Sequence, residues 1–209
     1  MTCMKEEKYL RMTARVLSAV FTPFYFPTVG FLALLMFTYL KLLPASFQLT
    51  LLGTVYAFTV LIPMVGIYLY RKINGWSLRH LGHKEKRVVP YAMTIAAYAA
   101  CLLLMYRMRI PHYLSGIIVA SLMALMICAV VNIWWKISAH MTAVGELVGG
   151  LLALSFLFFY NPVKWLCAFL LLAGMLGTSR MVLRQHTLAE VLAGFLVGVV
   201  CSVTGILFL

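Results

Sequence analysis

The sequence carries little charge, and acidic residues are especially few. Only 11% of its 209 residues are charged, and 5 Asp or Glu stand against 17 Lys or Arg. Hydrophobic residues make up 64%, and the mean hydropathy is +1.00. This composition lies outside the range of soluble globular domains and is typical of integral membrane proteins. We expect no nucleic-acid partner, because the apolar runs leave no room for a soluble basic domain.

Cysteines are also few, and internal repeats, low-complexity tracts and soluble domains are absent. The 5 cysteines stand singly, without the spacing of a metal site or a disulfide framework. We therefore expect buried free thiols, no metal site and no cofactor. The basic first residues lead into a long apolar run that lacks a small-residue cleavage site, which predicts a retained span and not a removed signal peptide.

What the sequence does contain is a series of long apolar runs. A spanning helix needs about 20 apolar residues. Seven segments qualify: Val16–Leu40, Leu49–Tyr70, Val88–Tyr106, Tyr113–Trp134, Met141–Tyr160, Val163–Thr178 and Thr187–Leu209. We expect an all-α, polytopic transmembrane helix bundle of six to seven spans, forming a single integral membrane domain over residues 1–209. Pro23 and Pro27 predict a kink in the first span, and the sixth segment is short for a full span.

Chemistry-bearing residues gather just before three of these spans. Lys84 to Arg87 precede the third span, Ser138 to His140 precede the fifth, and the segment from Ser179 to His186 precedes the seventh. Two spans separate each group from the next, so an even number of crossings returns all three groups to the same membrane face. Ionisable groups at membrane depth are costly and indicate function. We expect a site at helix ends on one membrane face.

The last group has the most informative spacing. His186 and Glu190 are four residues apart, so on a helix they would share a face. A carboxylate that holds one imidazole nitrogen leaves the other free to act as a base or a nucleophile. Ser138 is also a plausible N-cap. Helix N-termini favour anions, and together with the basic balance of the chain this predicts a phosphate or an anionic lipid headgroup as ligand.

At these residues the chain resembles the type 2 phosphatidic acid phosphatase superfamily, which also includes vanadium haloperoxidases. The family's third motif is Ser-Arg, five residues, His, three residues and Asp. Ser179, Arg180, His186 and Glu190 match it, with Glu in place of Asp.

The other two motifs of that family match less completely. The second, Pro-Ser-Gly-His, corresponds to Ser138, Ala139 and His140, with Ile in place of Pro and Ala in place of Gly. The first is Lys, six residues and Arg-Pro. In this chain two residues separate Arg87 from Pro90, whereas the motif has Arg and Pro adjacent. Lys84 is the nearest substitute for the family's lysine. The resemblance covers residues 84–195, the expected phosphatase core.

The resemblance implies a role for each matched residue. His186 would attack phosphorus and form a phosphohistidine, Glu190 would orient His186, and His140 would protonate the leaving group and then activate water. The remaining matched residues would bind the phosphate: Arg180, Arg87, Lys84, Ser138, Ala139 and Ser179. The implied reaction is metal-independent and needs no cofactor.

The expected function is therefore an integral membrane phosphatase acting on a lipid phosphate monoester or diphosphate. Phosphatidic acid, phosphatidylglycerophosphate and polyprenyl diphosphate are equal candidates. A lipid-to-acceptor phosphotransferase, a non-catalytic anion transporter and an inactive scaffold remain alternatives. Thirteen basic residues fall on the face with the three groups and four on the other, which favours a cytoplasmic site in a bacterial inner membrane, with a periplasmic site as the alternative. The sequence specifies no oligomeric state.

Overall fold

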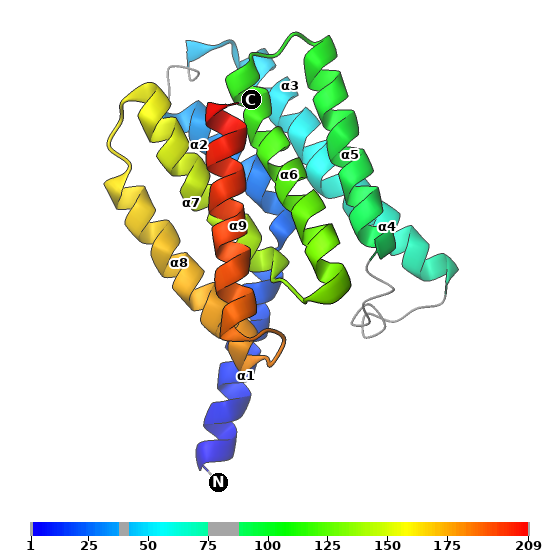
Figure 1. Ribbon diagram of the computed structural model, residues 1–209, viewed down its shortest axis with the longest axis vertical. Coiled ribbons are helices and arrows are strands. Elements are labelled where there is room, and N and C mark those ends of the chain that lie inside the picture. Colours follow the sequence, from blue (N-terminus) through cyan, green and yellow to red (C-terminus); the bar gives the residue numbers. More distant parts are fainter. Residues whose placement is uncertain (1, 38–41, 75–87, 209) are drawn as a thin grey trace.

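The computed structural model describes residues 2–37, 42–74 and 88–208, and every regular element in these ranges is helical (Figure 1). The elements are α1 (Thr2–Val20), η1 (Pro23–Tyr25), α2 (Phe26–Phe37), α3 (Ala45–Tyr56), η3 (Ala57–Leu61), α4 (Ile62–Ile73), α5 (Val88–Arg107), α6 (His112–Trp134), α7 (Ala139–Phe158), α8 (Val163–Val182) and α9 (Leu188–Leu207). The expected all-α bundle is confirmed.

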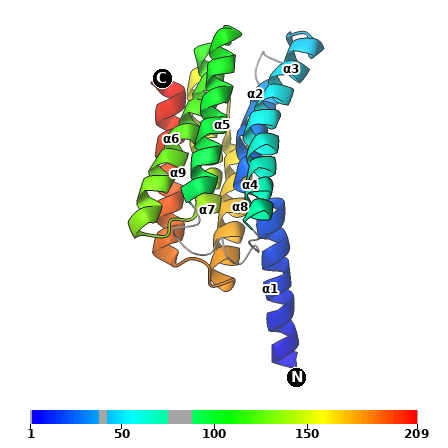
Figure 2. The same cartoon turned by 90° about the vertical axis from the view of Figure 1, so that its right-hand side faces the viewer.

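Seven helices among the described residues are long and apolar enough to cross a membrane, as the hydropathy pattern predicts. The first candidate span, Tyr9–Met36, combines the end of α1 with η1 and α2, and the second, Ala45–Ile73, combines α3, η3 and α4. The chain is therefore an integral membrane protein. Figure 2 shows that the N-terminal part of α1 extends beyond the rest of the bundle.

Prolines interrupt the first two spans. As predicted, the first span breaks at Pro23, which begins η1 after α1 has ended at Val20. The second span widens into the π-helical turn η3 just before Pro63, in the first turn of α4. Pro63 has no N–H to donate to the carbonyl four residues earlier, and its ring crowds that carbonyl, so the local helix must widen or kink.

The sixth span is longer than the sequence suggests. α8 has 20 residues and continues through Thr178 and Ser179 to Val182. The Thr178 hydroxyl donates to the Gly174 carbonyl at 2.8 Å, and the Ser179 hydroxyl donates to that of Met175 at 2.8 Å. Polar side chains satisfied in this way do not end a helix in lipid, so the expectation of a short span was wrong.

Helix α7 is buried along most of its length and packs closely on α9. A Cβ added at Gly145 would collide with the Phe195 carbonyl oxygen, and one added at Gly198 would collide with that of Thr142. These small residues therefore allow the two helices to pack closely. The two backbones that carry most of the candidate site therefore touch directly.

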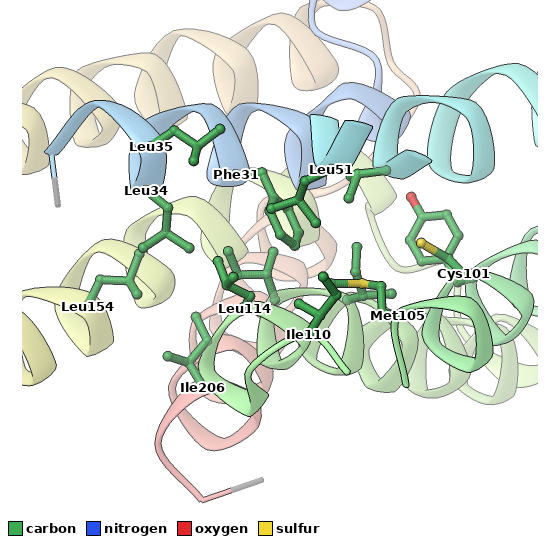
Figure 3. Close-up of a cluster of buried hydrophobic side chains, with 14 of the residues drawn as sticks. Phe31, Leu34, Leu35, Leu51, Cys101, Met105, Ile110, Leu114, Leu154 and Ile206 are labelled. Carbon is green, nitrogen blue, oxygen red and sulfur yellow. The ribbon is translucent and has the colours of Figure 1, made fainter. Parts of the chain in front are cut away.

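The apolar core lies mainly in the half of the bundle away from the candidate site. There Phe31 and Leu34 of α2 and Leu51 of α3 face Met105 of α5 and Leu114 of α6 (Figure 3). A second cluster, centred on Met141, Val144, Leu176 and Val191, packs directly beneath the site residues. The ends of the helices that carry the site are therefore supported by a packed apolar cluster.

Candidate functional site at three helix ends

The start of α7, the end of α8 and the start of α9 meet at one end of the bundle (Figure 1). His140 lies in the first turn of α7, Arg180 in the last turn of α8 and Glu190 in the first turn of α9. His186 lies in the connection between α8 and α9. The structure thus brings the second and third sequence groups to the same end of the molecule.

The connection after α8 reverses the chain tightly. The Gln185 N–H donates to the Arg180 carbonyl at 3.1 Å, and the Arg184 N–H donates to that of Met181 at 2.8 Å. Arg184 has φ 52°, the left-handed conformation that this type of helix ending requires. His186 follows directly and is thereby turned back toward α7.

The His186 ring is held at one nitrogen. Its Nδ1 lies 3.0 Å from Oε2 of Glu190 and 3.2 Å from the carbonyl oxygen of Lys136. Both partners are acceptors, so Nδ1 carries the proton and Nε2 keeps its lone pair. The contact does not arise from a shared helix face, as the spacing suggested, because His186 precedes the first residue of α9.

Glu190 reaches His186 because it also caps α9. Its Oε2 accepts from the Thr187 N–H at 3.1 Å, and its own N–H donates to the Thr187 hydroxyl at 3.4 Å. This reciprocal pair is a capping box. The sequence Thr-Leu-Ala-Glu carries its signature, so this geometry could have been read from the spacing of Thr187 and Glu190.

The environment lowers the pKa of His186 below its usual value of 6.5. Burial is the main cause, and the positive charges of Arg180 and Lys136 lower the pKa further. The hydrogen bond to Glu190 acts in the opposite direction and raises it. Near pH 7 the ring is therefore neutral.

His140 faces the same group of residues from α7. Its Nε2 lies 3.2 Å from the Ser18 carbonyl oxygen, so Nε2–H donates to the end of α1. Arg180 and His186 are both close enough to His140 to interact with it electrostatically. The two imidazoles and the guanidinium therefore form one cluster, joined by residues of α1.

Ser138 and Ala139 lie where the second motif predicts. Ser138 occupies the N-cap position of α7, but its hydroxyl makes no capping bond. That hydroxyl is buried and has no hydrogen-bond partner among the described residues. Ala139 avoids positive φ and begins the helix, so the backbone tolerates Ala at this position of the motif.

Ser179 is placed differently from the other matched residues. It is buried, and its hydroxyl donates to the Met175 carbonyl within α8. The proton that a phosphate oxygen would need is therefore engaged in the helix. Lys84 and Arg87, the expected phosphate ligands of the first motif, lie outside the described residues. Pro90, which follows them, lines the same cavity as Ala139.

Motif matching did not indicate three residues that adjoin the site, which are Lys136, Gln185 and Ser18. The Lys136 ammonium donates to the Gln185 carbonyl at 2.6 Å and ties the α6–α7 connection to the turn after α8. Ser18 and Thr22, at the end of α1, carry buried hydroxyls without partners among the described residues. Their position follows from tertiary packing of α1 on α8, for which a sequence has no local signal.

Among the described residues, no three His, Cys, Asp or Glu side chains gather in a way that could hold a metal ion. Comparisons of this chain with protein-family models, with curated proteins and with solved structures find no match.

Proposed function

We propose that this chain is an integral membrane phosphatase of the type 2 phosphatidic acid phosphatase superfamily, which hydrolyses a lipid phosphate monoester or diphosphate through a phosphohistidine. One observation carries the proposal. Glu190 and the Lys136 carbonyl hold Nδ1 of His186, which leaves Nε2 with its lone pair on a ring that interacts electrostatically with Arg180 and His140. A neutral, oriented imidazole next to a guanidinium is what nucleophilic attack on a phosphate requires.

In the first half-reaction, Nε2 of His186 attacks phosphorus while the bond from phosphorus to the lipid oxygen breaks. The negative charge of the bound phosphate favours the doubly protonated form of His140, and this ring gives a proton to the departing oxygen, which leaves as an alcohol or as a lipid monophosphate. Its Nε2 is held by Ser18, so Nδ1 delivers that proton. Glu190 stabilises the positive charge that develops on His186.

In the second half-reaction, Nδ1 of His140, now neutral, takes a proton from water. The water oxygen attacks phosphorus and the phosphorus–nitrogen bond breaks, which returns His186 and releases inorganic phosphate. Arg180 neutralises the phosphate oxygens throughout, and the Ser138 hydroxyl, free of other bonds among the described residues, donates to one of them. Lys84 and Arg87 supply further positive charge in this proposal, which includes no metal or cofactor.

A lipid substrate follows from the position of the site at the ends of membrane-spanning helices. Charge asymmetry favours the cytoplasmic face of a bacterial inner membrane, and periplasmic exposure of the same helix ends is the alternative. The transporter alternative receives less support. Transporters place broken helices in corresponding halves, whereas the breaks at η1 and η3 both fall within the first two spans.

The decisive experiment measures phosphate release by the purified protein from phosphatidic acid, phosphatidylglycerophosphate and polyprenyl diphosphate. We expect His186→Ala to lose about 10³-fold or more in rate, the scale seen when a nucleophile is removed. Vanadate should inhibit the wild-type protein, and EDTA should leave the rate unchanged.

The matched control is His112→Ala, which removes an exposed histidine from the start of α6 at the opposite end of the bundle. It should retain the wild-type rate. Turnover that survives in His186→Ala would show that another group is the nucleophile. Transfer of phosphate to an alcohol in preference to water would identify the phosphotransferase.

A further inference from the structure

A cavity of about 320 Å³ lies inside the bundle, between η1, α4, α5, α6 and α7. This volume falls within the range of small-molecule sites, about 300–1,000 Å³. The described residues that line it are largely apolar and include one carboxylate, Glu146 of α7, and no Lys, Arg or His. No residue of the candidate phosphatase chemistry, other than the backbone position Ala139, takes part in its walls.

Glu146 lies seven residues after Ala139, roughly 10 Å further along α7. It keeps some accessible surface because it lines this cavity and a smaller one of about 40 Å³ beside it. Its Oε2 accepts from the Ser121 hydroxyl at 2.6 Å. Among the described residues it has no cation within ion-pair distance. An ionised carboxylate at membrane depth without a counter-charge is costly, so the Glu146 carboxyl ionises when a bound cation supplies that charge.

The two threonine hydroxyls in the wall are already used. Thr94 donates to the Pro90 carbonyl at 2.8 Å, and Thr142 donates to that of Ser138 at 3.2 Å. The Ser121 proton is committed to Glu146. Glu146 is therefore the carboxyl group that the described wall offers to an incoming molecule, and most of the remaining wall is apolar.

Aromatic rings accompany the carboxylate. Phe24, Tyr91 and Tyr98 line the cavity, and Tyr98 is close enough to Glu146 for the two groups to interact electrostatically. Aromatic faces attract ammonium groups, most strongly where water is excluded. A carboxylate and several aromatic rings in one apolar cavity form a combination that recognises a positively charged group on a hydrophobic body.

We propose that this cavity binds a lipophilic ammonium compound, with its charged nitrogen at Glu146 and its apolar part against η1, α4 and α5. The proposal goes beyond the phosphatase function and does not rest on it, because the ligand is a cation and its partner is Glu146. A neutral hydrocarbon chain would fill the same volume but would make no ionic contact with Glu146.

The test measures binding of radiolabelled dodecylammonium to the full-length protein in zwitterionic phosphatidylcholine nanodiscs at pH 7, with dodecanol as the neutral competitor of the same length. We expect wild-type protein to bind the ammonium at least about tenfold more tightly than the alcohol. Glu146→Gln, which keeps the shape and a hydrogen bond with Ser121, should bind both within about twofold of each other. Thr94→Val is the matched control and should keep the wild-type preference, because the Thr94 hydroxyl bonds only to its own helix.

Equal affinity for the two compounds in the wild-type protein, or an ammonium preference that survives in Glu146→Gln, would overturn the proposal. The first result identifies a plain hydrocarbon pocket and needs no variant, so it applies even if a variant fails to fold. Glu146→Asp, which retains the charge, should retain the preference. His186→Ala should bind dodecylammonium as the wild type does, which separates this proposal from the phosphatase proposal.

Discussion

Oε2 of Glu190 lies 3.0 Å from Nδ1 of His186, and the same oxygen accepts the Thr187 N–H that begins α9. One carboxylate therefore fixes both the first turn of the last span and the orientation of an imidazole. A substitution at Glu190 therefore affects both the start of α9 and the orientation of His186, and measurements of stability and of rate are needed to separate the two effects.

Replacing Glu190 with Gln should lower the rate of phosphate release by about 10²- to 10⁴-fold, because the developing charge on His186 loses its partner. The carboxylate raises the pKa of His186, so its loss should lower that pKa further. The acidic limb of the kcat/KM profile, which reports the free enzyme, should move to lower pH. Glu190→Asp restores the charge and is the control. An acidic limb that stays in place, or moves to higher pH, would contradict the orienting bond.

Replacing Arg180 with Gln should raise the pKa of His186, because the positive charge of Arg180 lowers it in the wild-type protein. Histidine resonances followed by NMR over pH 4 to 8 would measure the change. The same variant should bind vanadate more weakly, since a guanidinium–phosphate pair is lost. Arg107→Gln, which changes an exposed arginine at the end of α5, should change neither quantity. An unchanged His186 pKa in Arg180→Gln would show that the two groups are further apart than described.

Ser138 and Ser179 provide a matched pair of buried hydroxyls. The Ser138 hydroxyl has no partner among the described residues, so Ser138→Ala should leave thermal stability unchanged or higher. It should still weaken phosphate or vanadate binding by about tenfold, because a donor to the phosphate is removed.

Ser179→Ala should show the opposite pattern. It removes a hydrogen bond inside α8 and should lower stability slightly, by about 1 kcal/mol, with little effect on vanadate affinity. Thermal unfolding and vanadate inhibition of both variants would decide the matter. A greater loss of vanadate affinity in Ser179→Ala than in Ser138→Ala would reverse the assignment of the two hydroxyls.

Gly198→Ala should destabilise the protein by about 1–3 kcal/mol or more, because its Cβ would meet the backbone of α7 at Thr142. Gly174→Ala on α8 is the control, since nothing lies within 4 Å of the added Cβ, and it should be neutral or stabilising. Thermal unfolding in detergent would compare them. Equal stability of the two variants would mean that α7 and α9 are further apart than the structure shows.

Much of the fold could be predicted because lipid imposes a simple rule on sequence. A span must be apolar over about 20 residues, so hydropathy located all seven candidates, and Pro23 located the break in the first. The widened turn before Pro63 was not predicted, since proline specifies a disruption but not which form it takes. The predicted sixth span ended at Thr178 because Ser179 and Arg180 are polar, yet the Ser179 hydroxyl bonds to a carbonyl of its own helix and α8 continues to Val182.

Part of the site could also be predicted from the sequence. The spacing of His186 and Glu190 predicted their contact, although a capping box produces it and not a common helix face. The contact between His140 and the Ser18 carbonyl joins residues 122 positions apart. It depends on how α1 packs against the bundle, and no local pattern encodes such an arrangement. The catalytic roles themselves remain predictions until the rates above are measured.

Glycines at 145, 149, 194 and 198 let the main chains of α7 and α9 approach without intervening side chains. At these positions no layer of side chains separates α7, which carries His140, from α9, which carries Glu190. In the proposed function, a lipid substrate therefore reaches the site by a route other than between α7 and α9, because no side chains there can rearrange to make space.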